Sequence, residues 1–341
     1  MIRVLVVDDL AFMRIAIRRM IEADNDMKVV GDARDGAEAV SLARELSPDV
    51  ITMDIQMPGM NGLEATTAIL ESVSPPPAIV MVSATTQDGA ADTIEALRRG
   101  AVDFVSKSSV FTNTDLAHIE NELRPILRAW AAHRRTPPPI VSPKAPPPRS
   151  PHPPDLIVVG ASTGGPQALS VLLRAAGKIR VPLVIAQHMP PFFTASLAAM
   201  LATDTGLDVR EAKSRETLVP GTVYLIAGGQ HGTLARGIAG FRLQLAAATE
   251  GAAPSIDRLF VSAARCAVSP LAILLTGMGQ DGCEGAQELR RRNASVLVQS
   301  PAECVVAGMP SAAIAAGAVD AVLSLADLGA WVAAAAGAGA A

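Results

Sequence analysis

The sequence predicts two α/β domains in tandem, each a doubly wound parallel sheet with helices on both faces. Three observations lead to this fold class. Short apolar runs alternate with longer helical patterns twice along the 341 residues, which is typical of parallel strands joined by crossover helices. A proline-rich segment separates the two alternating regions. Half of the residues are hydrophobic but only 3% are aromatic, so we expect cores built mainly from Ala, Val, Leu and Ile.

The first region contains five strand-like runs, each followed by a helical pattern. Because crossovers between parallel strands are right-handed, five such units allow few topologies. The expected strands are Arg3–Val7, Met27–Val30, Val50–Met53, Ala78–Val82 and Ala101–Val105. The expected helices are Phe12–Glu22, Gly36–Glu45, Leu63–Ser72, Ala90–Arg99 and Leu116–Trp130.

The segment between the two regions contains too much proline for a helix or a central strand. Ten of the 19 residues from Thr136 to Pro154 are proline, which lacks the backbone N–H that both structures need. Such a segment favours extended polyproline II and acts as a semi-rigid spacer. We therefore expect one domain at residues 1–130, a linker at residues 131–154 and a second domain at residues 155–341.

The second region repeats the alternation of strands and helices. The expected strands are Leu156–Val159, Leu183–Gln187, Thr222–Ile226, Leu271–Leu275 and Val296–Gln299. The expected helices include Pro166–Ala176, Thr194–Leu201, Ser255–Ala264 and Glu284–Arg292. Phe241–Ala246 reads as a hairpin strand, so we expect a small antiparallel extension beside the parallel sheet.

Composition excludes several classes of protein. The net charge of -4 argues against nucleic-acid binding, which usually requires a basic domain or stripe. The three cysteines, Cys266, Cys283 and Cys304, form no CxxC motif and fit a reducing cytoplasm. No run of 18 apolar residues exists, so no membrane insertion is expected. We expect a cytoplasmic monomer.

Polar residues collect where the expected strands of the first domain end. They are Asp8 and Asp9 after the first strand, Asp54 after the third, Ser83 after the fourth and Lys107 after the fifth. In open α/β sheets these ends meet at one edge, where ligands bind. Three carboxylates repel one another unless a cation lies between them, and their oxygens suit Mg²⁺. The lysine and the hydroxyl suit phosphate oxygens, and one carboxylate is placed to attack a phosphoryl group.

Three strands of the second domain also end in chemically related residues. Ser162 follows its first strand, His188 its second and Asp281 a later one. A serine, a histidine and an aspartate at one edge are the components of an acyl-transfer triad. Pro166 suits the first turn of a helix, so Ser162 lies in a tight strand-to-helix turn near backbone N–H groups. Those amides suit an anion, either a phosphate or a developing oxyanion.

Each of these motifs also has a simpler interpretation. Asp281 lies between glycines and is placed to cap a helix that begins near Glu284, while His231 competes with His188 for the role of base.

A dinucleotide site requires G-x-G-x-x-G and a later acidic residue, but Ser162 takes the second glycine position and the acid is missing. A P-loop requires a Gly-Lys-Ser/Thr ending, which this turn lacks. The chain order Ser, His, Asp disfavours the α/β-hydrolase fold, whose order is Ser, acid, His.

The first domain resembles two-component receiver domains from residue 1 to about 125. The matching residues are Val6-Val7-Asp8-Asp9, Asp54-Ile55-Gln56-Met57-Pro58-Gly59-Met60-Asn61-Gly62, Ser83 and Lys107. The resemblance implies that Asp54 is the phosphoacceptor and that Asp8, Asp9, Asp54 and the backbone carbonyl of Gln56 hold Mg²⁺. It also implies that Ser83 and Lys107 contact the phosphate and that Phe104 is an aromatic switch. Ser108 departs from the pattern, because receivers usually have a proline after the lysine.

The second domain resembles the chemotaxis protein-glutamate methylesterase family over residues 156 to about 325. The matching motifs are Gly160-Ala161-Ser162-Thr163-Gly164-Gly165, Gln187-His188-Met189-Pro190, Gly228-Gly229-Gln230-His231, Pro254-Ser255-Ile256-Asp257-Arg258-Leu259-Phe260, Thr276-Gly277-Met278-Gly279-Gln280-Asp281-Gly282 and Gly308-Met309-Pro310. The receiver in front completes the family's domain order. Two small departures are Gly228 in place of proline and Cys304 in place of serine.

The family resemblance implies a flavodoxin-like receiver followed by a Rossmann-like methylesterase domain without a cofactor of its own. Ser162 would be the nucleophile, His188 the base and Asp281 the residue that orients it. The backbone amides of Thr163 and Met278 would hold the oxyanion.

The implied activity is hydrolysis of glutamate γ-methyl esters on methyl-accepting chemotaxis receptors and deamidation of receptor glutamines, giving adaptation in chemosensory signalling. A chemotaxis histidine kinase would be the phosphodonor, and the unphosphorylated receiver would block the active site. The alternatives are a phospho-regulated binding protein with an inactive esterase domain and a serine hydrolase for another ester.

Overall fold

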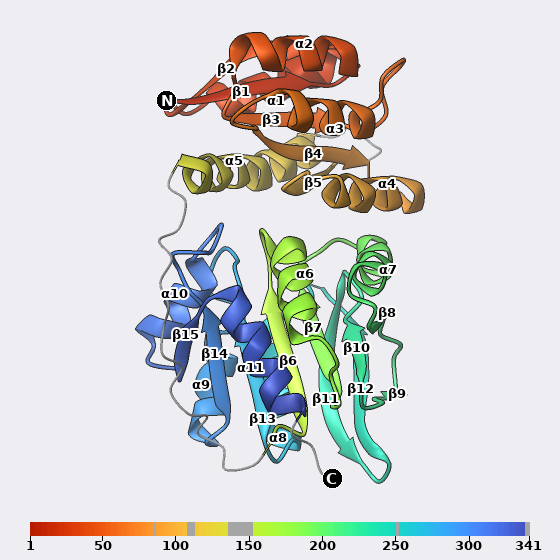
Figure 1. Cartoon of the computed structure of the whole chain (residues 1–341), viewed down its shortest axis with the longest axis vertical. Helices are drawn as coiled ribbons and strands as arrows, with labels where there is room; N and C mark the ends of the chain where they lie inside the picture. Colours follow the sequence, from red (N-terminus) through yellow and green to blue (C-terminus); the bar gives the residue numbers. More distant parts are fainter. Residues whose placement is uncertain (85, 108–112, 136–152, 250–251, 338–341) are drawn as a thin grey trace. The chain divides into compact units, whose positions relative to one another are not determined.

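The computed structural model describes residues 1–84, 86–107, 113–135, 153–249 and 252–337. The chain divides into two compact units, Met1–Pro137 and Pro138–Ala341, which run from red to yellow and from green to blue in Figure 1. Each unit is a parallel sheet covered by helices on both faces. The fold class predicted from the sequence is therefore confirmed.

The N-terminal sheet has five parallel strands in the order β2-β1-β3-β4-β5. This is the flavodoxin-like order expected for a receiver. The strands are β1 (Ile2–Val7), β2 (Met27–Ala33), β3 (Val50–Asp54), β4 (Ala78–Ala84) and β5 (Asp103–Lys107). The fifth strand begins and ends two residues later than expected, so Lys107 is the last residue of the strand and not part of the loop.

Five helices cover this sheet. They are α1 (Ala11–Glu22), α2 (Gly36–Leu46), α3 (Gly62–Ser72), α4 (Gln87–Arg98) and α5 (Asn113–Arg135). Helices α1 and α5 pack together on one face, while α2, α3 and α4 follow one another on the other. Helix α3 begins with a capping box, in which Asn61 and Glu64 each accept a hydrogen bond from the other's backbone N–H.

Helix α5 continues past the domain boundary expected at residue 130. Trp130 and Ala131 are buried, and the Trp130 indole N–H donates to Asp103 over 3.2 Å. One turn later, Arg134 donates to the carbonyl of Pro75 over 2.7 Å. These contacts keep the chain helical to Arg135, so residues 131–135 belong to the first unit and not to a linker. Most of the expected linker lies outside the described residues.

The C-terminal sheet has seven parallel strands in the order β15-β14-β13-β6-β7-β10-β8. They are β6 (Leu156–Ala161), β7 (Leu183–Gln187), β8 (Asp208–Glu211), β10 (Thr222–Leu225), β13 (Pro270–Leu274), β14 (Ser295–Gln299) and β15 (Ala321–Leu323). The two edge strands, β8 and β15, were not predicted. Their runs are too short to show a period-2 pattern.

The chain reverses its direction of travel across this sheet between β6 and β13. From β6 it proceeds to β7 on one side, and from β13 it proceeds to β14 on the other. Ligands in open α/β sheets bind in the crevice at such a reversal, outside the carboxyl ends of the strands. The loops after β6, β7 and β13 border this crevice.

A small antiparallel sheet lies beside the large one. It contains β11 (Gln230–Gly237), β12 (Gly240–Ala247) and β9 (Glu216–Thr217), in the order β11-β12-β9. The expected hairpin strand at residues 241–246 is β12. This hairpin packs against helix α8, where the backbone N–H of Leu234 donates to Ser262 Oγ over 3.0 Å.

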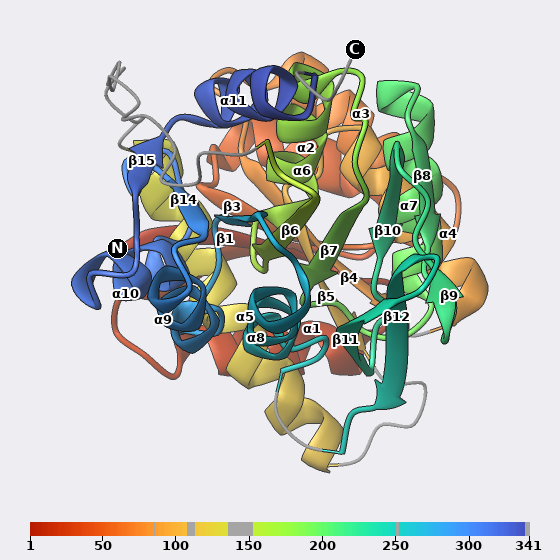
Figure 2. The ribbon, with the colours of Figure 1, turned by 90° about the horizontal axis from the view of Figure 1, so that it is seen from below.

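The helices of the C-terminal unit form a layer on each face of the large sheet. They are α6 (Gly165–Ala176), α7 (Phe193–Thr205), α8 (Ile256–Cys266), α9 (Cys283–Arg291), α10 (Gly308–Ala315) and α11 (Leu325–Gly337). Figure 2 shows α6, α7 and α11 on one face and α8 and α9 on the other. Among the described residues, no helix combines the length and apolarity that a bilayer crossing requires.

Helices α6 and α11 approach each other closely at a glycine. A Cβ atom on Gly329 would lie 2.4 Å from the Cβ of Ala175 and 2.9 Å from the carbonyl oxygen of Leu172. Helix propensity alone favours alanine over glycine by about 1 kcal/mol, but overpacking a tight contact costs about 1–3 kcal/mol. Close packing of these two helices therefore requires that position 329 carries no side chain.

We expect Gly329→Ala to lower the free energy of unfolding by about 1 kcal/mol or more in spite of its higher helix propensity. Urea denaturation of the full chain measures the effect. The control Ala330→Gly, at the next and exposed position of α11, measures the propensity contribution by itself and should cost about 1 kcal/mol. A stabilised Gly329→Ala variant would show that α6 and α11 are not in tight contact.

Candidate functional sites

Three carboxylates at the carboxyl edge of the N-terminal sheet lie close enough to share one cation. Asp8 and Asp9 follow β1, and Asp54 is the last residue of β3. One oxygen of each lies within 4.8 Å of the others. Asp8 and Asp54 are buried, whereas Asp9 is exposed. The structure thus brings together the three acidic residues that the strand ends predicted.

Lys107 faces these carboxylates from the end of β5. Its Nζ lies 2.8 Å from Asp54 Oδ2 and 3.2 Å from Asp8 Oδ2. Burial alone lowers the pKa of Lys107, but the two carboxylates outweigh burial and raise it. Burial also raises the pKa of both Asp8 and Asp54, and Lys107 opposes that rise. The lysine therefore stays charged and partly neutralises the buried acids.

The arrangement fits a hard cation and a phosphoryl group. Carboxylate oxygens with solvent access on one side are the donor set that Mg²⁺ prefers. A pocket of about 240 Å³ is lined by two of the three acids, Asp9 and Asp54, and by the other residues expected around a phosphate, Gln56, Ser83 and Lys107. Phe104 lies half-buried in β5. Ser108, the departure from the receiver pattern, lies outside the described residues.

Arg14 supports this site and was not found from the sequence. Its guanidinium donates to the backbone carbonyls of Asp8, over 2.8 Å, and Asp9, over 3.1 Å. The same side chain forms an ion pair with Asp32 at 3.3 Å. These bonds hold the acidic turn in position. An arginine on an amphipathic helix is too common to signal such a role.

Ser162, His188 and Asp281 form a continuous chain of hydrogen bonds at the carboxyl edge of the C-terminal sheet. The Ser162 Oγ lies 3.2 Å from His188 Nδ1, and His188 Nε2 lies 2.8 Å from Asp281 Oδ2. The serine and the histidine directly follow β6 and β7, while Asp281 lies on the longer loop after β13. All three side chains are partly buried.

Asp281 is held at the beginning of helix α8. Its carboxylate accepts hydrogen bonds from the backbone N–H groups of Ile256 and Asp257, each over 2.8 Å. Burial raises the pKa of Asp281, but His188 and these two amides outweigh it and hold the pKa at about 2. The aspartate therefore caps a helix, as its simpler interpretation had it, but the helix is α8 and not the one that follows it in sequence.

The ionised Asp281 decides which imidazole nitrogen carries the proton. A carboxylate only accepts hydrogen bonds, so the N–H of His188 is at Nε2. Nδ1 then has a free electron pair and accepts the hydroxyl proton of Ser162. The two nitrogens thus have the reverse of their roles in the chymotrypsin triad, where Nε2 faces the serine. Either nitrogen is chemically able to act as the base.

The turn that carries Ser162 is fixed by residues to which the sequence analysis assigned no role. The Ser162 N–H donates to the carbonyl of Thr276 over 3.0 Å, and the Thr276 hydroxyl donates to the carbonyl of Thr163 over 3.0 Å. Gln299 accepts the Thr276 N–H over 2.8 Å. On the other side, the Gln187 amide donates to the carbonyl of Ser162 over 2.9 Å. These bonds tie the loops after β6, β7, β13 and β14 together.

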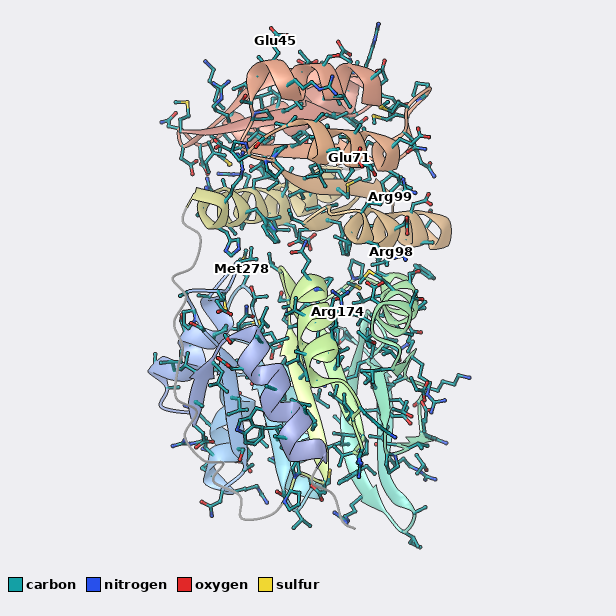
Figure 3. The ribbon with its side chains drawn as sticks, in the orientation of Figure 1. Glu45, Glu71, Arg98, Arg99, Arg174 and Met278 are labelled. Atoms are coloured by element: carbon teal, nitrogen blue, oxygen red, sulfur yellow. The ribbon has the colours of Figure 1, made fainter. Side chains whose placement is uncertain are left out.

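The backbone N–H groups of Thr163 and Met278 have no hydrogen-bond partner among the described residues. Thr163 directly follows Ser162 in the turn before α6. Met278 lies on the loop that carries Asp281, and Figure 3 shows it at the end of the C-terminal unit where these loops gather. Two unpaired amides on adjacent loops are suitable donors for a developing oxyanion.

His231, the rival to His188, has a structural partner. Its Nδ1 accepts the backbone N–H of Ser255 over 3.1 Å, one residue before α8 begins. Burial is the main cause that lowers the pKa of His231. Ser255 in turn caps α8 and contacts Asp281 Oδ1 at 3.4 Å. His231 therefore supports the helix end that holds Asp281.

Asp257 lies beside Asp281 and has the opposite protonation behaviour. It accepts the backbone N–H of Gly285 over 2.7 Å. Burial is the largest cause that raises its pKa to about 6, and the charge of Asp281 adds to the rise. A raised pKa means that folding favours the protonated acid. Asp257 therefore destabilises the folded protein increasingly as the pH rises from about 4 through 6.

We expect Asp257→Asn to raise the free energy of unfolding at pH 8 and to change it little at pH 4. The pKa of Asp257 rises from 3.8 to about 6, and this difference limits the gain in unfolding free energy to at most about 3 kcal/mol. Solvent screening at this half-buried site reduces the expected gain to about 1–2 kcal/mol. Urea denaturation at both pH values measures it. An equal effect at both would show that Asp257 ionises normally.

Comparisons with known proteins identify relatives of both units. Residues 157–332 match the CheB methylesterase family, and residues 4–118 match the response regulator receiver domain. The chain is 33% identical to the crystal structure of the Thermotoga maritima CheB methylesterase catalytic domain, with a TM-score of 0.50. That likeness covers 53% of this chain and 97% of the other.

Two further relatives match over nearly the whole chain. The chain is 41% identical to the protein-glutamate methylesterase/protein-glutamine glutaminase of Thermotoga maritima, over 94% of this chain and 95% of the relative. It is 42% identical to protein-glutamate methylesterase/protein-glutamine glutaminase 1 of Caulobacter vibrioides, over 96% of each chain. The chain therefore belongs to the CheB family of receiver-containing protein-glutamate methylesterases/protein-glutamine glutaminases.

Proposed function

We propose that the protein hydrolyses glutamate γ-methyl esters on methyl-accepting chemotaxis receptors, deamidates specific receptor glutamines and is activated by phosphorylation of its receiver. The observation that carries the proposal is the hydrogen-bonded chain from Ser162 through His188 to Asp281. It occurs in a chain whose relatives are named for these two activities. Ester and amide hydrolysis share one mechanism, because both proceed by acyl transfer.

In the acylation step, Ser162 Oγ attacks the γ-carbonyl carbon of the substrate. His188 Nδ1 takes the hydroxyl proton, and the resulting imidazolium is stabilised by Asp281. The carbonyl electron pair moves to oxygen, where the N–H groups of Thr163 and Met278 hold the charge. The tetrahedral intermediate then breaks its bond to the leaving group. His188 returns its proton, and methanol leaves from an ester or ammonia from a glutamine.

In the deacylation step, water attacks the acyl-serine in the same way. His188 takes one proton from the water and passes it to Ser162 Oγ as the acyl bond breaks. The receptor side chain leaves as a free carboxylic acid, which ionises at neutral pH. Because the pKa of Asp281 is about 2, its negative charge is available throughout the cycle.

We propose that Asp54 accepts a phosphoryl group from a chemotaxis histidine kinase in the cytoplasm. Asp8, Asp9, Asp54 and the carbonyl of Gln56 would hold Mg²⁺, whose charge offsets that of the phosphate oxygens. A phosphoryl group adds about -1.5 to -2 charges beside Lys107, which now pairs with Asp54 at 2.8 Å. Lys107 and Ser83 would shift to the new oxygens, and this rearrangement would relieve inhibition by the receiver.

We expect Ser162→Ala to reduce methanol release from a methylated receptor by about 10⁴-fold or more, because the nucleophile is lost. The assay follows methanol with the full-length protein and a phosphodonor. Ser170→Ala, on the helix that follows the nucleophile turn, is the matched control and should keep normal activity. Undiminished release by Ser162→Ala would contradict the mechanism, whereas no release by the unmodified protein would favour the alternative of a binding protein with an inactive esterase domain.

We expect Asp54→Asn to abolish the increase in methylesterase activity caused by a phosphodonor, because an amide does not accept a phosphoryl group. The ratio of rates with and without phosphodonor is the measured quantity. Glu45→Gln, an exposed carboxyl on α2 (Figure 3), is the control and should keep the normal ratio. A normal ratio in Asp54→Asn would place the phosphorylation elsewhere.

A further inference from the structure

Phe192 has an unfavourable backbone conformation and an exposed aromatic side chain. Its φ is 75° and its ψ is -26°, in the left-handed region that bulky residues rarely occupy. Four described residues other than glycine have a positive φ, namely Ser47, Phe192, Arg215 and Asn293, and Phe192 alone among them is aromatic. Its side chain is 53% exposed. Neither the backbone conformation nor burial of the side chain favours an aromatic residue at this position.

The left-handed turn itself has a structural cause. On one side, the loop after β7 is packed against two glycines: a Cβ on Gly228 would lie 2.2 Å from the carbonyl oxygen of Pro190, and a Cβ on Gly229 would lie 2.8 Å from the Pro191 ring. On the other side, helix α7 begins at once with Phe193, which is fully buried. The chain must therefore reverse at residue 192.

The residue type at this turn is not explained by the fold. Glycine adopts a positive φ without a penalty, and asparagine tolerates it. A phenylalanine is strained at a positive φ, and here more than half of its surface is exposed to water. A locally unfavourable residue without a packing gain indicates a functional constraint.

Phe192 lies next to the candidate active site. It follows His188 by four residues on the loop after β7. On the loop that carries Asp281, Met278 is 39% exposed and lies at the same carboxyl end of the sheet (Figure 3). The two loops that supply the base and its acidic partner thus each present one large apolar side chain to solvent. Exposed aromatic anchors beside a site are typical of residues that dominate binding to a protein partner.

We propose that the Phe192 ring binds the substrate protein, by contacting apolar side chains that flank the esterified glutamate. This inference rests on the proposed methylesterase function and adds a specificity-determining residue to it. Because Phe192 lies four residues after His188 on the same loop, its exposed ring is placed to contact residues close to the reacting glutamate. The fixed turn holds the ring in place before binding, which reduces the entropy lost on association.

The test is steady-state kinetics of methanol release from a methylated receptor with the full-length Phe192→Gly protein. We expect KM to rise about tenfold, which corresponds to the loss of about 1.4 kcal/mol of binding, while kcat stays within about twofold, as expected when uniform binding is lost. The variant should also unfold at a temperature a few degrees higher, because glycine relieves the strained turn. A more stable enzyme with weaker substrate binding is an outcome that a purely structural role does not produce.

Two further variants separate the loss of the ring from the added backbone flexibility of glycine and from the loss of an exposed apolar side chain elsewhere. Phe192→Asn introduces a residue that tolerates the left-handed turn without the flexibility of glycine. It should show the same rise in KM, because it also lacks the ring. Ile238→Ala removes a fully exposed apolar side chain from the tip of the β11–β12 hairpin and should leave KM and kcat unchanged.

An unchanged KM in Phe192→Gly and Phe192→Asn overturns the inference and leaves the proposed function intact. A fall in kcat at constant KM also overturns it, since Phe192 would then act by positioning His188. If the unmodified protein releases no methanol from the receptor, the proposed function fails and the inference fails with it.

Discussion

The carboxylate of Asp281 is the interaction on which the geometry of the C-terminal site depends. One side chain accepts the first backbone N–H groups of helix α8 and the imidazole N–H of His188. The hydrogen bond from His188 and the two helix amides together lower the pKa of Asp281 to about 2 against the effect of burial, and the partial positive charge at a helix N-terminus also favours an anion there. The loop after β13, the helix α8 and the loop after β7 are thereby joined at one point.

The two units stabilise buried negative charge in different ways. In the N-terminal unit, Asp8 and Asp54 are opposed by the ammonium group of Lys107, a mobile charge on a flexible side chain. In the C-terminal unit, Asp281 is opposed by backbone amides that are fixed in a helix. A flexible counter-charge suits a site whose charge changes when a phosphoryl group is added. A fixed one suits a residue that must keep the same charge through a catalytic cycle.

Much of both candidate sites was predictable because parallel strands bring their carboxyl ends to one edge. Asp8, Asp54, Ser162 and His188 lie directly at or after strands, so a strand-by-strand reading found them. The supporting residues were less visible. Thr276 holds the nucleophile turn through the carbonyl of Thr163, and Gln299 holds Thr276 through its backbone N–H. The sequence placed both residues at strand ends but did not indicate these contacts. The edge strands β8 and β15 were missed because they are too short to show a periodic pattern.

The sequence by itself determined the two α/β units, the proline-rich division between them and the residue types gathered at each sheet edge. These follow from hydrophobic periodicity and from the position of polar residues at strand ends, which are local properties of the chain. Tertiary structure alone decided that Asp281 caps α8, that His188 turns Nδ1 toward Ser162, and that α5 continues to Arg135. It alone showed the strained, exposed Phe192 as well. Each of these depends on contacts between segments far apart in sequence, and the energy of such contacts is not encoded in any local pattern.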